Sequence, residues 1–186
     1  YGEYRYEFEP FMGYLRDTFH DATCRIQAEP CCCKTTSNYN VGPVSRKPKQ
    51  GRLATRQRLD VHDSEKLVLI TMGGIPASYP YLNELYGFDN CRFLVPGDNK
   101  QLEVDHNLIL LPYRSDFYHP DLVQAADVVI GKVGYSTLAE LYHAGIPFGY
   151  FTRSSFRESE VLAGYIDRHM PGLRMAENSY HEGTWI

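Results

Sequence analysis

The residue types best suited to chemistry gather in one short stretch, where a predicted strand leads through a glycine turn into a predicted helix. The apolar run 127–130 is long enough for one buried parallel strand, and the turn Gly131-Lys-Val-Gly134 follows it. Such a turn lets a ligand approach the backbone and presents N–H groups at the positive end of a helix dipole, which suits a phosphate or diphosphate. Ser136 or Thr137 can cap the helix and add hydroxyl donors. Glu140, on the first turns of the same helix, can accept hydrogen bonds from a ribose.

Alternating strands and helices must position this turn. The clearest strand is Lys66–Met72, whose continuous apolar content predicts burial on both faces, as in a parallel sheet. Gly73 and Gly74 follow at its carboxyl end, where ligands bind in open α/β sheets. The other expected elements are helix Pro10–Phe19, strand Cys24–Ala28, helix Arg52–Leu59, helix Tyr79–Tyr86, strands Cys91–Val95 and Leu108–Leu111, helix Asp116–Ala126, a helix ended by Gly145, strand Phe148–Phe151, and a helix opened by a capping box at Ser155–Glu158. Beyond Leu173 there is little apolar periodicity.

The segment ADVVIGKVGYSTLAELYHAGIPF resembles the donor-binding signature of GT-B glycosyltransferases. It is similar to the bacterial family that adds N-acetylglucosamine to the peptidoglycan lipid precursor and to uncharacterised nucleotide-sugar transferases. In that signature a Gly-x-x-Thr-x-x-Glu turn and helix holds the nucleotide diphosphate and the ribose, and Gly134, Thr137 and Glu140 match it. The resemblance covers roughly Gly42 to the C-terminus.

The resemblance implies a role for each candidate residue. It places diphosphate binding at Gly73, Gly74, Gly134, Ser136 and Thr137, ribose binding at Glu140, the base side at Tyr113, the sugar side at Arg153, Phe156 and Glu158, and the hinge at Arg46. The lipid-precursor enzymes carry glutamines in the sugar loop, so the match is weakest there. In inverting relatives the general base lies in the N-terminal domain, so the resemblance leaves the catalytic residue unknown in this chain.

Each of these residues also has an ordinary structural interpretation. Many α/β proteins use a glycine turn only for tight packing, and Glu140 alone is typical of a solvated helix face. Arg153 and Glu158 can form a surface ion pair or a cap, and Tyr113 can cover the sheet edge. The combined spacing favours the nucleotide-sugar interpretation. Lys132 lacks the preceding glycine of a P-loop, so an ATP P-loop is disfavoured.

Composition narrows the class of protein. The 186 residues carry a net charge of −4 and are 43% hydrophobic, which fits a globular chain and argues against wholesale binding of nucleic acid. No apolar run reaches membrane-spanning length, and no signal peptide is visible. The five cysteines are best explained as reduced thiols, so we expect a cytoplasmic protein. A zinc site combining Cys31–Cys33 with His20 is the alternative.

Three segments make up the expected domain organisation. Residues 1–41 are a remnant of a preceding domain, residues 42–60 are a basic linker and first helix, and residues 61–186 form a nucleotide-sugar-binding α/β domain. The expected fold is a doubly wound parallel sheet, Rossmann-like, as in the C-terminal half of a GT-B enzyme. Because the chain begins at Tyr1 rather than Met, we expect a fragment that lacks an N-terminal half. The basic linker admits three interpretations: a nucleic-acid patch, a solvated face, or a flank of an anionic donor.

The predicted function is donor binding in a glycosyltransferase of carbohydrate metabolism. We expect the donor to be a nucleotide-diphospho-sugar, UDP-linked, whose hexosyl group goes to an unknown acceptor without a required Mg²⁺ or other metal. We expect this chain alone to bind without turnover and to need its N-terminal domain. The rivals are a cofactor-free epimerase using Glu158 and His181, and a non-catalytic nucleotide-sugar-binding or regulatory domain. A Ser-His-Asp hydrolase is disfavoured because the segment from Gly134 to Leu138 lacks the second glycine of G-x-S-x-G.

Overall fold

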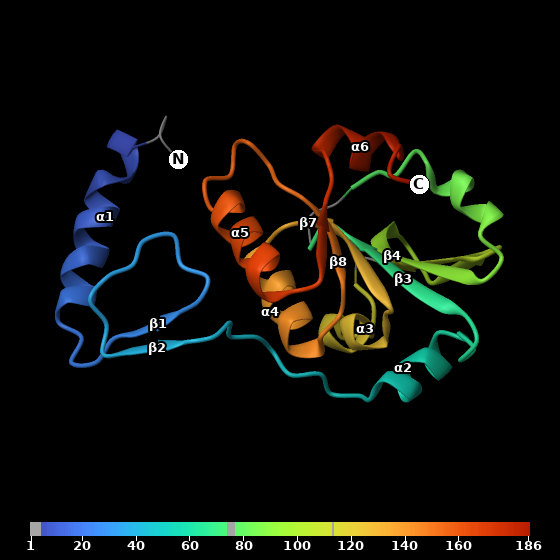
Figure 1. Ribbon diagram of the computed structural model, residues 1–186, viewed down its shortest axis with the longest axis horizontal. Helices are drawn as coiled ribbons and strands as arrows, with labels where there is room; N and C mark the ends of the chain where they lie inside the picture. The colour runs from blue at the N-terminus through green and yellow to red at the C-terminus, as the bar shows by residue number, and fades with distance from the viewer. Residues whose placement is uncertain (1–4, 74–76, 113) are drawn as a thin grey trace. The chain divides into compact units, whose positions relative to one another are not determined.

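The computed structural model describes residues 5–73, 77–112 and 114–186 (Figure 1). Gly74 and Tyr113, two of the predicted site residues, lie outside the described residues. The chain divides into two compact units, Tyr1–Gly42 and Pro43–Ile186. The roles predicted for the three sequence segments stay predictions.

The first unit contains helix α1 (Arg5–His20) and a parallel pair of short strands, β1 (Ile26–Ala28) and β2 (Tyr39–Val41). The predicted helix and the predicted strand before residue 30 are confirmed. The helix begins at Arg5, so Pro10 lies inside it rather than in its first turn. Apolar side chains along α1 are exposed, including Tyr6 and Phe11.

The second unit alternates strands and helices along the chain, as expected for an α/β domain. Its elements are α2 (Arg52–Arg58), β3 (Lys66–Thr71), the 3₁₀ helix η2 (Leu82–Gly87), β4 (Cys91–Asn99), β5 (Glu103–Asp105), β6 (Leu108–Pro112), α3 (His119–Ala125), β7 (Val128–Lys132), α4 (Tyr135–Ala144), β8 (Phe148–Phe151), α5 (Ser159–His169), β9 (Gly172–Arg174) and α6 (Glu177–Glu182).

The seven strands form one sheet in the order β5-β6-β4-β3-β7-β8-β9. Every pairing is parallel except that of β5 with β6. Numbered along the chain, the six parallel strands run 3-2-1-4-5-6, which is the doubly wound order. The fold class predicted from the sequence is therefore confirmed. The strand order reverses between β3 and β7, so their carboxyl ends form the crevice where such sheets bind ligands.

Helices cover both faces of this sheet (Figure 1). On one face α3, α4 and α5 bury a core that includes Leu69, Leu138 and Ile166. On the other face η2 and α6 pack over a second core that includes Ile70, Phe151 and Tyr180. The strands are apolar on both faces for this reason, and the sheet fixes the ends of β3 and β7 side by side.

Two predicted helix starts are wrong in detail. No side chain caps α4: its N-cap is Gly134, which leaves Ser136 and Thr137 inside the first turn. The capping box at Ser155–Glu158 does not form either, and α5 begins at Ser159 with no side-chain cap. Backbone turns explain this second difference, because Phe156 N–H donates to the Arg153 carbonyl and Ser159 N–H donates to the Phe156 carbonyl.

Candidate functional site

The ends of β3 and β7 bring three predicted residues together around a lysine that was not among them. A Cβ atom on Gly73 would lie 3.5 Å from both the Lys132 Nζ and the Thr137 Oγ1. A Cβ atom on Gly134 would lie 3.3 Å from the same Nζ. The Lys132 ammonium, the Thr137 hydroxyl and the backbone of the two glycines therefore converge at the switch point. We call these four residues the cradle.

The backbone of the cradle needs glycine at one point. Gly73 has φ +63°, a left-handed conformation that L side chains rarely adopt, and its N–H donates to Thr71 Oγ1 at 3.0 Å. Gly131 has a different role from the one expected. It lies inside β7 opposite Thr71, and a Cβ there would be 2.0 Å from the Thr71 carbonyl oxygen. Gly131 therefore allows two strands to pair closely.

A second cation acts on the cradle. Burial lowers the pKa of Lys132, the positive charge of Arg153 lowers it further, and Glu158 opposes both. The Arg153 guanidinium lies 4.6 Å from the centre of the Phe156 ring, and its Nε is buried without a hydrogen-bond partner among the described residues. The three predicted sugar-side residues thus lie in the loop that follows β8, close enough for two of them to influence Lys132. Two neighbouring like charges favour binding of an anion.

Glu140 is not a solvated helix residue. Its side chain is only 3% exposed, and each oxygen has a partner. Arg46 donates to Oε1 from Nη2 at 2.7 Å and from Nε at 3.1 Å, and His119 Nδ1 lies 2.7 Å from Oε2. Burial alone would raise the pKa of Glu140, but the hydrogen bonds and charges of His119 and Arg46 outweigh burial and lower it. Glu140 follows Thr137 of the cradle by one helical turn on the same helix.

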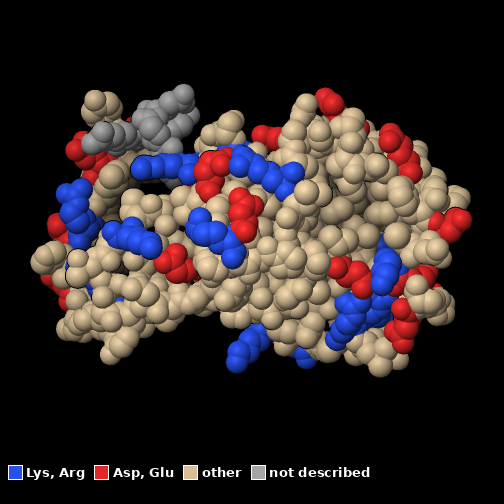
Figure 2. Space-filling view, in the orientation of Figure 1, with Lys and Arg blue, Asp and Glu red and all other residues tan. Residues whose placement is uncertain are grey.

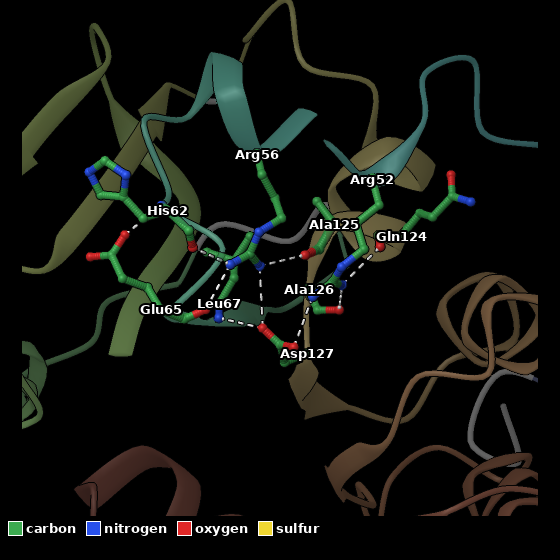
Figure 3. A network of polar contacts seen from close by, with 9 residues as sticks. All are labelled: Arg52, Arg56, His62, Glu65, Leu67, Gln124, Ala125, Ala126 and Asp127. Atoms are coloured by element: carbon green, nitrogen blue, oxygen red, sulfur yellow. Dashed lines mark hydrogen bonds and ion pairs between the residues drawn. The ribbon is translucent and has the colours of Figure 1, made fainter. Parts of the chain in front are cut away.

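The arginines of the basic linker have structural partners, and Figure 3 shows those of Arg52 and Arg56. Arg52 and Arg56 both contact the Asp127 carboxylate, at 2.8 and 3.3 Å. Arg56 also donates to the carbonyl groups of His62 and Glu65. The network ties α2 to the start of β7. On the face drawn in Figure 2, basic and acidic side chains are interspersed, which does not favour the nucleic-acid interpretation.

The remaining predicted residues lie outside the cradle. Ser136 is exposed on the first turn of α4. His181, the epimerase candidate, packs its ring edge-on against Phe151 with the centroids 5.6 Å apart. All five cysteines are free thiols, and among the described residues no group of three or more metal-ligating side chains occurs. Within the same residues no helix is long and apolar enough to cross a bilayer.

Sequence reasoning missed two residues of the site. Lys132 was compared only with the P-loop pattern, although a lysine that ends a buried strand before a glycine turn is itself a signal. His119 was not among the predicted residues, but it begins α3 and contacts Glu140. No local pattern connects His119 with Glu140, because the contact spans two elements.

The fold matches that of a GT-B half-domain. The glycosyltransferase of kitacinnamycin superposes with a TM-score of 0.50 and 15% identity, over 62% of this chain and 31% of that one. The spinosyn forosaminyltransferase SpnP gives a TM-score of 0.49 and 15% identity, over 84% of this chain and 42% of that one. The chain thus spans less than half of either structure.

Sequence similarity points to one further protein. The chain is 29% identical to L-arabinokinase of Arabidopsis thaliana over 142 residues, which are 76% of this chain and 13% of the relative. No model of a known protein family matches the chain. The specific likeness to the peptidoglycan lipid-precursor family stays a prediction.

Proposed function

We propose that the unit Pro43–Ile186 binds a nucleotide-diphospho-sugar, UDP-linked, as the donor half of a cytoplasmic glycosyltransferase. The observation that carries this proposal is the cradle: the Lys132 ammonium and Thr137 Oγ1 both lie beside the backbone of Gly73, and the ammonium also lies beside that of Gly134, at the switch point of the sheet. The unpaired Nε of Arg153 and its charge beside Lys132 add to the attraction for a diphosphate.

The chemistry follows from where negative charge develops. When a glycosyl group leaves its nucleotide, the diphosphate gains charge, and fixed cations and N–H groups aimed there stabilise the transition state. Lys132 and Arg153 provide two positive charges, so the reaction requires no Mg²⁺. Glu140 accepts hydrogen bonds from the ribose, and Phe156 and Glu158 face the sugar. Tyr113 and Gly74 keep the base-side and diphosphate roles that the resemblance implies. The resemblance implies a general base in an N-terminal domain and leaves the hexosyl acceptor unknown, so we expect this chain alone to bind the donor without turnover.

Calorimetric titration with UDP, ADP and GDP tests the proposal. Lys132→Met should weaken UDP binding about 10- to 100-fold, because a hydrogen bond to a charged group contributes about 1.5–3 kcal/mol. Lys66→Met is the matched control: it removes one positive charge from the opposite end of β3, where the side chain is exposed. The proposal fails if the wild-type chain binds no nucleotide. It also fails if Lys132→Met binds UDP as tightly as the control Lys66→Met does.

A second candidate function is a non-catalytic nucleotide-sugar sensor attached to a sugar kinase. The likeness to L-arabinokinase favours it, because a transferase half-domain within a kinase chain suggests regulation. UDP-arabinose therefore belongs with the UDP-hexoses in a ligand screen. Release of UDP or formation of a glycoside from a bound UDP-sugar would exclude this candidate. Conversion of one UDP-sugar into another would point to the epimerase.

A further inference from the structure

Residues 43–50, which we call the strap, lie across α3 and α4 and are fixed at both ends. At the first end, the Pro43 carbonyl oxygen lies 2.7 Å from the His143 ring nitrogen Nε2. The next residue, Val44, donates its N–H to the Tyr135 hydroxyl at 3.1 Å. Both partners belong to α4, so the strap begins against the helix that carries Glu140.

The other end of the strap is fixed to α3. The N–H groups of Lys49 and Gln50 donate to Asp121 Oδ1 at 2.6 and 3.1 Å. The Lys49 ammonium also lies 4.4 Å from the centre of the Tyr118 ring, directly before α3. Asp121 is buried, so this attachment is a built contact rather than a solvated one.

Between these ends Arg46 reaches down to Glu140. The Arg46 side chain is 55% exposed, whereas the carboxylate that it contacts is 3% exposed. Its guanidinium also lies 5.3 Å from the centre of the Tyr118 ring. Arg46 and Glu140 line a cavity of about 230 Å³ together with Gln124 and His143. The half-exposed Arg46 side chain therefore covers the buried carboxylate of Glu140.

This arrangement sets a condition on the ribose contact. A carboxylate that binds a vicinal diol accepts one hydrogen bond on each oxygen, and here Oε1 already accepts two from Arg46 while Oε2 faces His119. His119 is held in α3 and its side chain is 26% exposed, whereas that of Arg46 is 55% exposed, so Arg46 is the partner that can leave into solvent. A ligand hydroxyl and the Arg46 guanidinium compete for Oε1.

We propose that Arg46 is a lid on Glu140, which must swing away before this carboxylate can bind the ribose of a nucleotide. The inference rests on the proposed nucleotide binding. A lid that is closed in about nine molecules of ten lowers the apparent affinity about tenfold, because only the open fraction binds. Removing the lid then tightens binding, although it also removes a positive charge near an anionic ligand.

The direction in which UDP affinity changes when the Arg46 side chain is removed distinguishes a lid from a simple attraction for anions. We would measure the dissociation constants of UDP and of inorganic pyrophosphate, which has no ribose, for the wild type and for Arg46→Ala. Lys47→Ala is the matched control, since it removes one charge from an exposed position of the strap next to Arg46. Thermal melting of each variant verifies that it is folded.

The lid predicts that Arg46→Ala binds UDP about 5- to 10-fold more tightly. Its affinity for pyrophosphate should stay level or fall, and we expect the same of Lys47→Ala. A variant that loses affinity for both ligands would show that Arg46 simply attracts anions, and the lid would be refuted. Equal UDP affinity in the wild type and Arg46→Ala would refute it as well. If neither protein binds UDP, the proposed function itself fails and the lid with it.

Discussion

Asp127 should be the most sensitive charged position of the second unit, because one carboxylate joins three elements (Figure 3). Its oxygens accept hydrogen bonds from Arg52, from Arg56 and from the Leu67 N–H. The Arg56 side chain is 3% exposed, and among the described residues Asp127 is the carboxylate paired with it. Replacing Asp127 with alanine therefore leaves a buried guanidinium that only carbonyl groups contact.

The magnitude follows from that burial. Breaking a buried ion pair by removing one partner costs about 3–5 kcal/mol, since the remaining charge is uncompensated. The Asp127 side chain is 26% exposed, so we expect the lower part of that range for Asp127→Ala. Asp127→Asn keeps an acceptor but loses the charge, so it should cost less than Asp127→Ala. Arg52→Ala breaks the half-exposed pair, which should cost roughly 1 kcal/mol or less. It also removes the hydrogen bonds from Arg52 to the carbonyl groups of Gln124 and Ala126.

Urea unfolding followed by tryptophan fluorescence measures these differences. Trp185 is the sole tryptophan and packs edge-on against Tyr81 inside the second unit, so its signal reports this unit. With an m-value of about 2 kcal/mol/M, Asp127→Ala should lower the urea midpoint by roughly 2 M. A midpoint that stays close to that of the wild type, at an unchanged m-value, would refute the assigned role of this network.

The same network predicts a pH dependence. Burial raises the pKa of Asp127, but the Leu67 N–H and the charges of Arg52 and Arg56 outweigh it, so the folded-state pKa lies below its ordinary value. The stabilisation is then complete above the unfolded pKa of about 4 and is lost as pH falls through the lower folded value. The difference between wild type and Asp127→Ala should therefore shrink in acid below about pH 4.

Two further predictions concern packing and the alkaline range. Gly131→Ala places a Cβ 2.0 Å from the Thr71 carbonyl oxygen and should unfold the sheet at β3–β7. Gly51→Ala is the control, because its Cβ meets no atom within 4 Å and the change should be tolerated. Thermal melting followed by circular dichroism compares the two variants. The Tyr150 hydroxyl donates to Asp167 Oδ1 at 2.7 Å, and burial together with that carboxylate raises the pKa of Tyr150. The hydrogen bond therefore stabilises the fold fully below about pH 10, and this stabilisation is lost as pH rises toward the folded-state pKa. Tyr150→Phe should cost about 1 kcal/mol at neutral pH and less above pH 10, and equal unfolding midpoints of the two proteins at neutral pH would contradict this.

The fold was predictable where apolar runs were continuous. β3 and β8 are buried along almost their whole length, and a run of that kind has few alternatives to a central parallel strand. β9 was missed because all three of its residues are exposed, and β5 because three residues carry no period. Short edge strands of this kind form because a neighbouring strand offers hydrogen bonds, which is information that the local sequence lacks.

In the candidate site, too, the residues that are close in sequence were predictable and the contacts between distant residues were not. The spacing of Thr137 and Glu140 on one helix was readable, because residues three apart share a face. The partners of Glu140 were not, because Arg46 precedes it by 94 positions and His119 by 21. A motif therefore locates the carboxylate but does not say whether its oxygens are available. Whether Glu140 binds a ribose depends on the free energy of its contact with Arg46, so two chains with the same motif can differ in nucleotide affinity through the strap alone.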